Sequence, residues 1–196
     1  YRGASPIQSA LLSGERQTGI SVMQMAEKMD AGPVYKTFSI PIEPEDNAST
    51  LHDKLAELTA QKTPDVLVSI AEGKLKAKPQ NEEKVTFSKK LSKADGKIDW
   101  NEDAVTIVKK IRAYWGWPGS YTAFKGQHLK ILAGKASKEK SGTGMVFEKS
   151  GKILMGTGQD SLELITVQLE GKKAMPIQEF IQGHPDFMGT KLGENN

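Results

Sequence analysis

The stretch GISVMQMAEKMDAGP, residues 19–33, decides the fold class that the sequence predicts. Its first part, residues 19–25, is a short apolar run, which is typical of a strand covered on both faces of an α/β sheet. A loop follows and ends in Asp-Ala-Gly-Pro, a composition typical of tight turns. Open α/β sheets bind ligands just beyond the carboxyl ends of their strands. We therefore take Asp30 as the candidate catalytic group, while composition leaves an ordinary turn aspartate as the alternative.

The elements around this stretch complete an α/β half. A short helix is predicted over residues 5–14, with a serine cap, a proline at the first helical position and a glycine at the end. A second strand is predicted over residues 34–42, at a sheet edge because prolines mark its end. Two helices are expected after it. A capping box at residues 50–53 opens the first, and Thr-Pro-Asp at residues 63–65 starts the second.

The sequence changes character after residue 73. Residues 74–86 are rich in charge and lack an apolar period, so we expect an interdomain linker there. A helix is predicted over residues 103–113 and a last short one around residues 177–181. Between them lie five strand candidates separated by glycine turns: residues 120–124, 128–136, 144–148, 152–156 and 162–169. This spacing is typical of a small antiparallel barrel or sandwich. The predicted fold class is therefore α/β plus β, with an α/β domain over residues 1–73 and a β domain over residues 87–196.

Composition excludes several kinds of chemistry. The 196 residues contain no Cys, which rules out disulfides, thiol catalysis and cysteine-ligated zinc. The three His lack the spacing of a metal site, so no metal is expected. No apolar run approaches the roughly 20 residues that a membrane span needs. We expect a cytoplasmic protein without a membrane partner.

The charge is unevenly distributed along the chain. Residues 1–78 hold 9 Lys and Arg against 10 Asp and Glu, whereas the remaining residues hold 18 against 14. A basic second half indicates a polyanionic partner, with a lysine-rich solvated surface as the simpler interpretation. Trp115 and Trp117 are interpreted as packing a helix against the barrel, and stacking on nucleobases is the alternative.

Six short motifs in order carry a family resemblance over nearly the whole chain. They are RGASPIQ (2–8), TGISVMQM (18–25), MDAGP (29–33), KLSK with IDW (90–93 and 98–100), IRA leading to WPG (111–113 and 117–119), and GKKAM (171–175). The first three resemble the tetrahydrofolate-dependent formyltransferases. The last three resemble, within that family, the branch that acts on methionyl-tRNA. Each motif alone is weak, and their shared order makes the resemblance specific.

The resemblance implies a fold and an activity. It implies a Rossmann-like catalytic domain, here in part, followed by an OB-like barrel that helps to hold tRNA. The implied reaction moves a formyl group from 10-formyltetrahydrofolate to the α-amino group of methionine on initiator tRNA. Asp30 matches the Asp of an Asn, His and Asp trio. The family often has Thr where this chain has Ala31, a minor departure for the carboxylate itself.

The resemblance also implies binding residues. The loop Met25, Ala26, Glu27, Lys28 and Met29 is expected to border the pterin ring of the folate donor, because soft apolar side chains and backbone groups suit a flat ring. Filling of a core is the alternative for the methionines. The lysines expected to contact tRNA phosphates are Lys89, Lys90, Lys93, Lys172 and Lys173.

The Asn-x-His stretch of the family is expected immediately before Tyr1, so the chain is interpreted as a fragment. We expect these 196 residues alone to lack activity, because the oxyanion-binding pair is not among them. An unpaired sheet edge within residues 1–42 is expected to support a dimer.

Two further functions stay open. One is a relative that formylates a nucleotide sugar, or that hydrolyses or oxidises formyl-folate. The other is a noncatalytic RNA-binding module built on the barrel.

Overall fold

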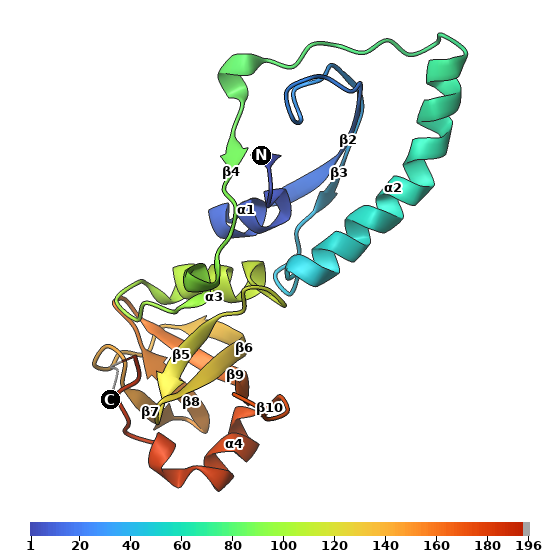
Figure 1. The fold of residues 1–196 in the computed structure, drawn as a ribbon. Coiled ribbons are helices and arrows are strands. Elements are labelled where there is room, and N and C mark those ends of the chain that lie inside the picture. The colour runs from blue at the N-terminus through green and yellow to red at the C-terminus, as the bar shows by residue number, and fades with distance from the viewer. Residues whose placement is uncertain (194–196) are drawn as a thin grey trace. The chain divides into compact units, whose positions relative to one another are not determined.

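The computed structural model describes residues 1–193 and divides the chain into two compact units, Tyr1–Leu91 and Ser92–Asn196. Figure 1 draws the chain as a ribbon and labels most of its helices and strands. Among residues 1–193, no helix combines the length and the apolar character that crossing a bilayer requires.

The first unit combines two helices with two small sheets (Figure 1). Its elements are β1 (Arg2–Gly3), α1 (Pro6–Ser13), β2 (Gln17–Met23), β3 (Val34–Pro41), α2 (Ala48–Ala71), a 3₁₀ turn (Glu82–Lys84) and β4 (Phe87–Ser88). Strands β2 and β3 form an antiparallel hairpin, and β1 pairs in parallel with β4. The helix predicted over residues 5–14 and the strand predicted over residues 34–42 are thereby confirmed, because α1 and β3 occupy them.

The burial of strand β2 differs from the prediction. We expected it to be covered on both faces, but its residues alternate between exposed and half-buried. Ile20 and Val22 lie on the half-buried side, and Gly19 and Ser21 alternate with them on the exposed side. This period of two is the pattern of a strand with one covered face. The prediction weighted the apolar run and overlooked the small residues between its members.

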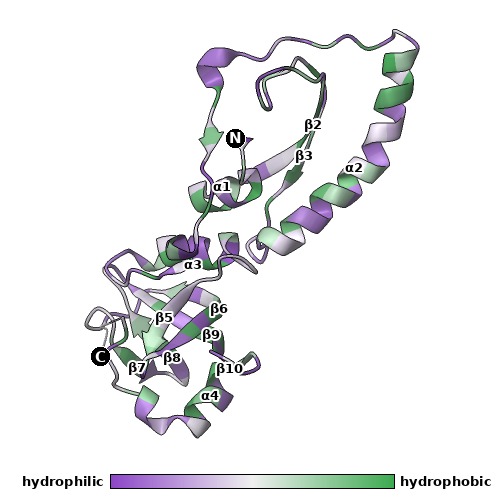
Figure 2. Ribbon diagram, in the orientation of Figure 1, coloured by the Kyte–Doolittle hydropathy of each residue, from purple (hydrophilic) through white to green (hydrophobic). Residues whose placement is uncertain are grey.

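The two helices predicted after residue 50 are one helix. Helix α2 runs for 24 residues with Pro64 inside it. An interior proline removes one helical hydrogen bond and usually costs about 3 kcal/mol. The helix continues because Leu51, Leu55 and Val66 bury one face along its length. Figure 2 shows hydrophobic and hydrophilic residues alternating along it.

The start of α2 also differs from the prediction. The capping box joins Asn47 and Thr50, rather than residues 50 and 53. Asn47 Oδ1 accepts from the backbone N–H groups of Ser49 (2.9 Å) and Thr50 (3.1 Å), and the Asn47 N–H donates to Thr50 Oγ1. The true cap lies three residues before the predicted one, because an asparagine accepts from helix N–H groups as well as threonine does.

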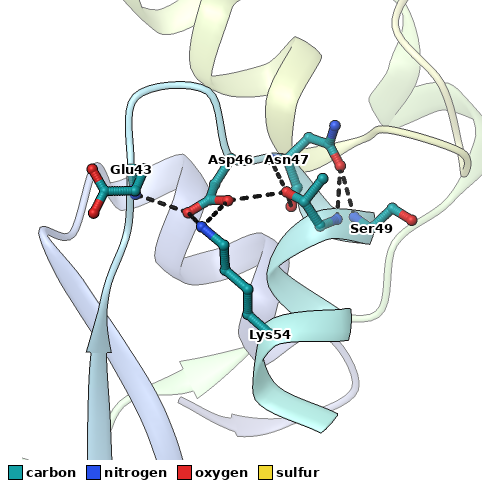
Figure 3. A network of polar contacts seen from close by, with 6 residues as sticks. Glu43, Asp46, Asn47, Ser49 and Lys54 are labelled. Atoms are coloured by element: carbon teal, nitrogen blue, oxygen red, sulfur yellow. Dashed lines mark hydrogen bonds and ion pairs between the residues drawn. The ribbon is translucent and has the colours of Figure 1, made fainter. Parts of the chain in front are cut away.

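A buried carboxylate, Asp46, supports this helix start (Figure 3). Asp46 accepts from the Glu43 N–H (2.8 Å), the Thr50 hydroxyl (3.1 Å) and Lys54 Nζ (2.7 Å). Burial by itself would raise the pKa of Asp46. The Lys54 ammonium and the Glu43 and Thr50 donors outweigh it and hold that pKa below its ordinary value.

The segment predicted as a linker, residues 74–86, lies within the first unit, whose boundary falls at residue 91. Val34 and Lys78 exchange two backbone hydrogen bonds (2.8 and 2.9 Å). Ser5, predicted to cap α1 with its side chain, instead donates its hydroxyl to the Lys89 carbonyl. The segment is polar because it is held by hydrogen bonds rather than by apolar burial.

The second unit contains a six-stranded antiparallel sheet (Figure 1). Its strands are β5 (Tyr121–Phe124), β6 (Gln127–Ser137), β7 (Val146–Lys149), β8 (Lys152–Gly156), β9 (Ser161–Leu169) and β10 (Met175–Pro176). The order is β5-β6-β9-β8-β7, with β10 also paired to β9. All five predicted strands are present. The two predicted helices are confirmed as α3 (Ala104–Ala113) and α4 (Ile177–Gly183), and a 3₁₀ turn (Lys93–Gly96) precedes α3.

The core of this unit is one continuous apolar cluster. Helix α3 packs against β6 and β9, and α4 packs against β9 and β10. Fully buried members include Ile107, Leu129, Leu162 and Phe180. Burying side chains of this size contributes about 1.5–3 kcal/mol each. Figure 2 shows the hydrophobic residues spread over these strands.

Candidate functional site

Asp30 lies in the loop between β2 and β3 and is half-buried. Its backbone has a φ of 55°, a left-handed conformation that aspartate tolerates better than most residues. Oδ2 accepts a hydrogen bond from the Gly3 N–H at 3.0 Å. Within residues 1–193, Oδ1 has no hydrogen-bond partner, so one carboxylate oxygen is fixed and the other is open.

The loop that carries Asp30 closes on itself. The Gln24 N–H donates to the Pro33 carbonyl at 2.8 Å and closes the base of the loop. Gly32 is buried, and a Cβ placed there would lie 1.7 Å from the Gln24 carbonyl oxygen. Only glycine fits such a close approach. The glycine of the motif is therefore a structural requirement of the loop.

The predicted folate-binding residues lie along the outside of this loop. Met25, Ala26, Glu27, Lys28 and Met29 are all exposed, with Met25 88% and Met29 74% accessible. Core filling, the alternative for the methionines, is wrong in this structure. The role of these residues toward the folate donor stays a prediction.

Three residues that the sequence patterns did not single out as site residues lie around the Asp30 loop. The Gln80 side chain donates from Nε2 to the carbonyls of Asp30 (2.9 Å) and Gly32 (2.7 Å). Arg2 Nη2 donates to Gln80 Oε1 at 3.0 Å, and the Arg2 guanidinium also binds both carboxylate oxygens of Glu82 at 2.9 and 3.1 Å. The sequence signal was an Arg in the first motif and a Gln after a proline in an apparent linker.

The Arg2 and Glu82 pair is mutually stabilised in its charged form. The hydrogen bond to Glu82 raises the pKa of Arg2, and the same bond lowers the pKa of the Glu82 carboxyl. Two hydrogen bonds between one guanidinium and one carboxylate fix the orientation of the two groups as well as their distance. Arg2 is thereby held pointing at Gln80 and Glu82.

The predicted tRNA-binding lysines divide between the units. Lys89 and Lys90 are exposed residues of the first unit. Lys93, Lys172 and Lys173 are exposed residues of the second. Lys172 and Lys173 lie in the turn between β9 and β10, where the Lys172 N–H donates to the Leu169 carbonyl at 2.9 Å.

A hollow of about 270 Å³ opens on the second unit beside these lysines. Its walls are Lys93, Pro118, Tyr121, His128, Lys130, Gln168, Leu169, Glu170 and Gly171. The rings of Tyr121 and His128 stack with centroids 4.6 Å apart. The sequence patterns did not single out Lys130 or this ring pair. These residues lie near Lys93 only because strands β5 and β6 pair in the folded sheet.

The tryptophans differ from their interpretation. Trp115 is 39% and Trp117 57% accessible, so neither is buried between a helix and the sheet. The buried tryptophan of this unit is Trp100, whose Nε1 donates to Thr122 Oγ1 at 3.1 Å. Within residues 1–193, His, Asp and Glu side chains form no group of three or more placed to hold a metal ion.

Comparison with family models matches both units. The model described as "Formyl transferase" matches residues 1–67, and the model described as "Formyl transferase, C-terminal domain" matches residues 90–185. The chain is 37% identical over 193 residues to the methionyl-tRNA formyltransferase of Acidiphilium cryptum, covering 98% of this chain and 62% of that protein. It is 39% identical over 204 residues to that of Lactococcus lactis subsp. cremoris, covering 99% and 63%.

The chain belongs to the formyl transferase family. It spans 62–63% of the length of these curated relatives.

Solved structures show the same fold. HypX from Aquifex aeolicus, crystallised with tetrahydrofolic acid, matches with a TM-score of 0.69 and 20% identity over 92% of this chain and 32% of that one. An N-formyltransferase from Helicobacter canadensis, crystallised with folinic acid and dTDP-3-aminofucose, matches with a TM-score of 0.67 and 17% identity over 84% and 61%. At these identities the likeness concerns the fold, a formyltransferase fold with a Rossmann-like part and an antiparallel sheet.

Proposed function

We propose that this chain takes part in the transfer of a formyl group from 10-formyltetrahydrofolate to the α-amino group of methionyl-initiator-tRNA, a step in translation initiation. The observation that carries the proposal is the state of Asp30. It is a half-buried carboxylate with one oxygen held by the Gly3 N–H and the other open. The family match across both units and the identity to methionyl-tRNA formyltransferases support it.

Asp30 suits a proton-transfer role in this reaction. The amine nitrogen attacks the formyl carbon and forms a new C–N bond, and the bond between that carbon and the folate nitrogen breaks. The proton lost by the amine ends on the folate nitrogen. We assign Oδ1 of Asp30 to carry that proton, directly or through one water. The oxyanion that forms during transfer would be stabilised by the Asn and His that the resemblance implies.

The residues around Asp30 fit a folate donor in their chemistry. Met25 and Met29 offer polarisable apolar surface, and the exposed loop offers backbone donors and acceptors. We propose that residues 25–29 border the pterin ring.

The second unit suits an RNA backbone. Lys93 and Lys130 line the hollow beside the Tyr121 and His128 rings. Lys172 and Lys173 directly follow Gly171, which also lines the hollow. Lysines give salt-dependent contacts to phosphates, and aromatic rings stack on unpaired bases. We propose that this sheet is the OB-like tRNA platform. We also propose that Lys89 and Lys90 contact tRNA phosphates from the first unit, and that the protein works in the cytoplasm.

A second partner proposal concerns the first unit. Strands β2 and β3 form a two-stranded sheet within residues 1–193, and open strand edges recruit other chains. We propose that residues 1–42 support a dimer of the 196-residue chain. Light scattering tests this, and a monodisperse monomer would contradict it.

The central test uses a completed enzyme, which we define as residues 1–196 joined to the part of the Lactococcus lactis relative that has no counterpart here. Asp30→Asn should reduce formyl transfer at least about 1,000-fold while leaving tRNA affinity unchanged. Asp53→Asn, an exposed aspartate on α2, is the matched control and should be fully active. Near-normal turnover by Asp30→Asn would overturn the proposal.

Residues 1–196 alone should bind tRNA without formylating it, because the Asn-x-His stretch that the resemblance implies is not among them. Turnover with formyl-folate and methionyl-tRNA by this polypeptide would contradict that expectation. One of the fold neighbours, the N-formyltransferase from Helicobacter canadensis, was crystallised with a nucleotide sugar. Offering the completed enzyme both acceptors separates the alternatives, and we expect turnover with methionyl-tRNA only.

A further inference from the structure

We infer that Gln80 is a positioning residue that sets the orientation of Asp30. The inference rests on the proposed function, because it gives Gln80 a role toward the carboxylate assigned there. Gln80 belongs to the segment predicted as a linker, and it is 50 residues away from Asp30 in sequence.

The Gln80 amide is fully engaged in the Asp30 loop. Its Nε2 donates to the carbonyls of Asp30 at 2.9 Å and Gly32 at 2.7 Å, which uses both N–H bonds. Its Oε1 accepts from Arg2 Nη2 at 3.0 Å. The amide orientation follows from these partners, since the flipped amide would set its oxygen against two carbonyl oxygens.

The loop needs such an anchor at these carbonyls. Asp30 adopts a left-handed backbone, and Gly32 lies against the Gln24 carbonyl. The Asp30 carbonyl belongs to the peptide bond that leads into Ala31, and the Gly32 carbonyl belongs to the Gly32–Pro33 peptide bond. Holding both of them fixes the backbone from which the Asp30 side chain projects.

The clamp is closed through the neighbouring residues Arg2 and Gly3. The Gly3 N–H holds Asp30 Oδ2, while the Arg2 guanidinium holds Gln80. The Arg2–Gly3 dipeptide therefore positions both parts of Asp30: the side chain through the Gly3 N–H, and the backbone through Arg2 and Gln80. Strand β1, formed by these two residues, is itself fixed by pairing with β4.

The segment that carries Gln80 is anchored at both ends. Lys78 exchanges backbone hydrogen bonds with Val34, directly after the loop. Glu82 binds Arg2 through both carboxylate oxygens. Arg2 binds Glu82 and Gln80, and within residues 1–193 no ion pair joins it to Asp30.

The test compares Gln80→Met and Gln80→Glu in the completed enzyme. Displacing a reacting group by about 1 Å costs up to about 100-fold in rate. We expect kcat to fall about 10- to 100-fold for Gln80→Met, with the KM for methionyl-tRNA changed less than about twofold. Gln80→Glu should lose more, because its carboxylate faces two carbonyl oxygens. If Gln80 only filled space, the more isosteric Glu would be tolerated better than Met.

A second readout needs no catalysis. In residues 1–196, the Gly3 and Gln24 amide protons should exchange with solvent at least about 10-fold faster in Gln80→Met than in the parent chain. Gln61→Met on α2 is the matched control and should change neither readout, because within residues 1–193 the Gln61 side chain binds only Glu57 on the same helix.

The outcomes separate this inference from the proposed function. Normal kcat for Gln80→Met beside an inactive Asp30→Asn would overturn the positioning role alone. Normal kcat for both variants would overturn the proposed function as well. A variant that loses kcat only together with global unfolding, or Gln80→Glu more active than Gln80→Met, would also overturn the inference.

Discussion

Different forces stabilise the interior of the second unit and the Asp30 loop of the first. In the second unit, helices α3 and α4 and the sheet bury one continuous cluster of apolar side chains. In the first unit, the loop that carries Asp30 is fixed by hydrogen bonds from Gly3 and Gln80. A hydrogen bond contributes about 0.5–1.5 kcal/mol net, whereas a buried core side chain contributes about 1.5–3 kcal/mol. Apolar burial therefore stabilises the second unit, whereas hydrogen bonds orient the Asp30 loop of the first unit.

The largest loss of stability is expected from a cavity in the apolar core of the second unit. Phe180 is 1% accessible and packs edge-on against Phe124 and Phe187. Phe180→Ala should destabilise the unit by about 3–5 kcal/mol. Urea unfolding with residue-resolved hydrogen exchange measures it. Amides of the Asp30 loop should stay as protected as before, and Val105→Ala on the exposed face of α3 should change little.

The next largest effect is expected from the loop itself. Gly32→Ala places a methyl group against the Gln24 carbonyl and should cost about 3 kcal/mol of local stability. Hydrogen exchange should increase at Gly3 and Gln24 and stay constant throughout the second unit. Gly183→Ala is the control, because a Cβ there meets open space. Wild-type protection of Gly3 in Gly32→Ala would show that the loop is less constrained than its geometry indicates.

A third prediction concerns acid stability of the first unit. The folded-state pKa of Asp46 is lowered from its ordinary value of 3.8. Its stabilisation is therefore complete above about pH 4 and is lost as the pH falls through the folded pKa. Asp46→Asn should cost about 2 kcal/mol at pH 7 and progressively less toward pH 2. A constant difference between the two proteins across this range would contradict the assignment.

The smallest effect is expected on RNA binding. Lys172→Ala with Lys173→Ala should weaken tRNA binding by residues 1–196 about 10-fold and lower the salt slope by about 2. The matched control is Lys149→Ala with Lys152→Ala, which removes the same charge from lysines already paired with Glu139 and Glu163. Equal losses in both double variants would mean that net charge, rather than a surface, governs binding.

Much of the second unit could be predicted from the sequence. Its strand candidates are apolar segments separated by glycine turns at regular spacing, so local pattern and final structure agree. Helix α2 was predicted less well, because Pro64 is a strong local signal that the burial of Leu51 and Val66 overrides. The fold class was predictable where the decisive forces act between near neighbours.

The candidate site was predictable only in part. Asp30 stands out through its turn composition and its motif. Gln80 does not, because its bonds reach back 48 and 50 residues to carbonyls whose positions no local pattern reveals. Its segment looked like a linker because it lacks an apolar period. Polar segments that work through hydrogen bonds are invisible to hydropathy, so a site built on them is underestimated from sequence.

The pairing of β1 with β4 has a consequence for synthesis. Arg2 and Gly3 are synthesised well before their strand partners Phe87 and Ser88, with nearly all of the first unit between them. The Asp30 loop therefore remains without Gln80, and without the strand that fixes Gly3, while the residues between them are translated. Its geometry is complete only when residues 80–88 are present, so the orientation of the Asp30 carboxylate depends on a segment that is made long after it.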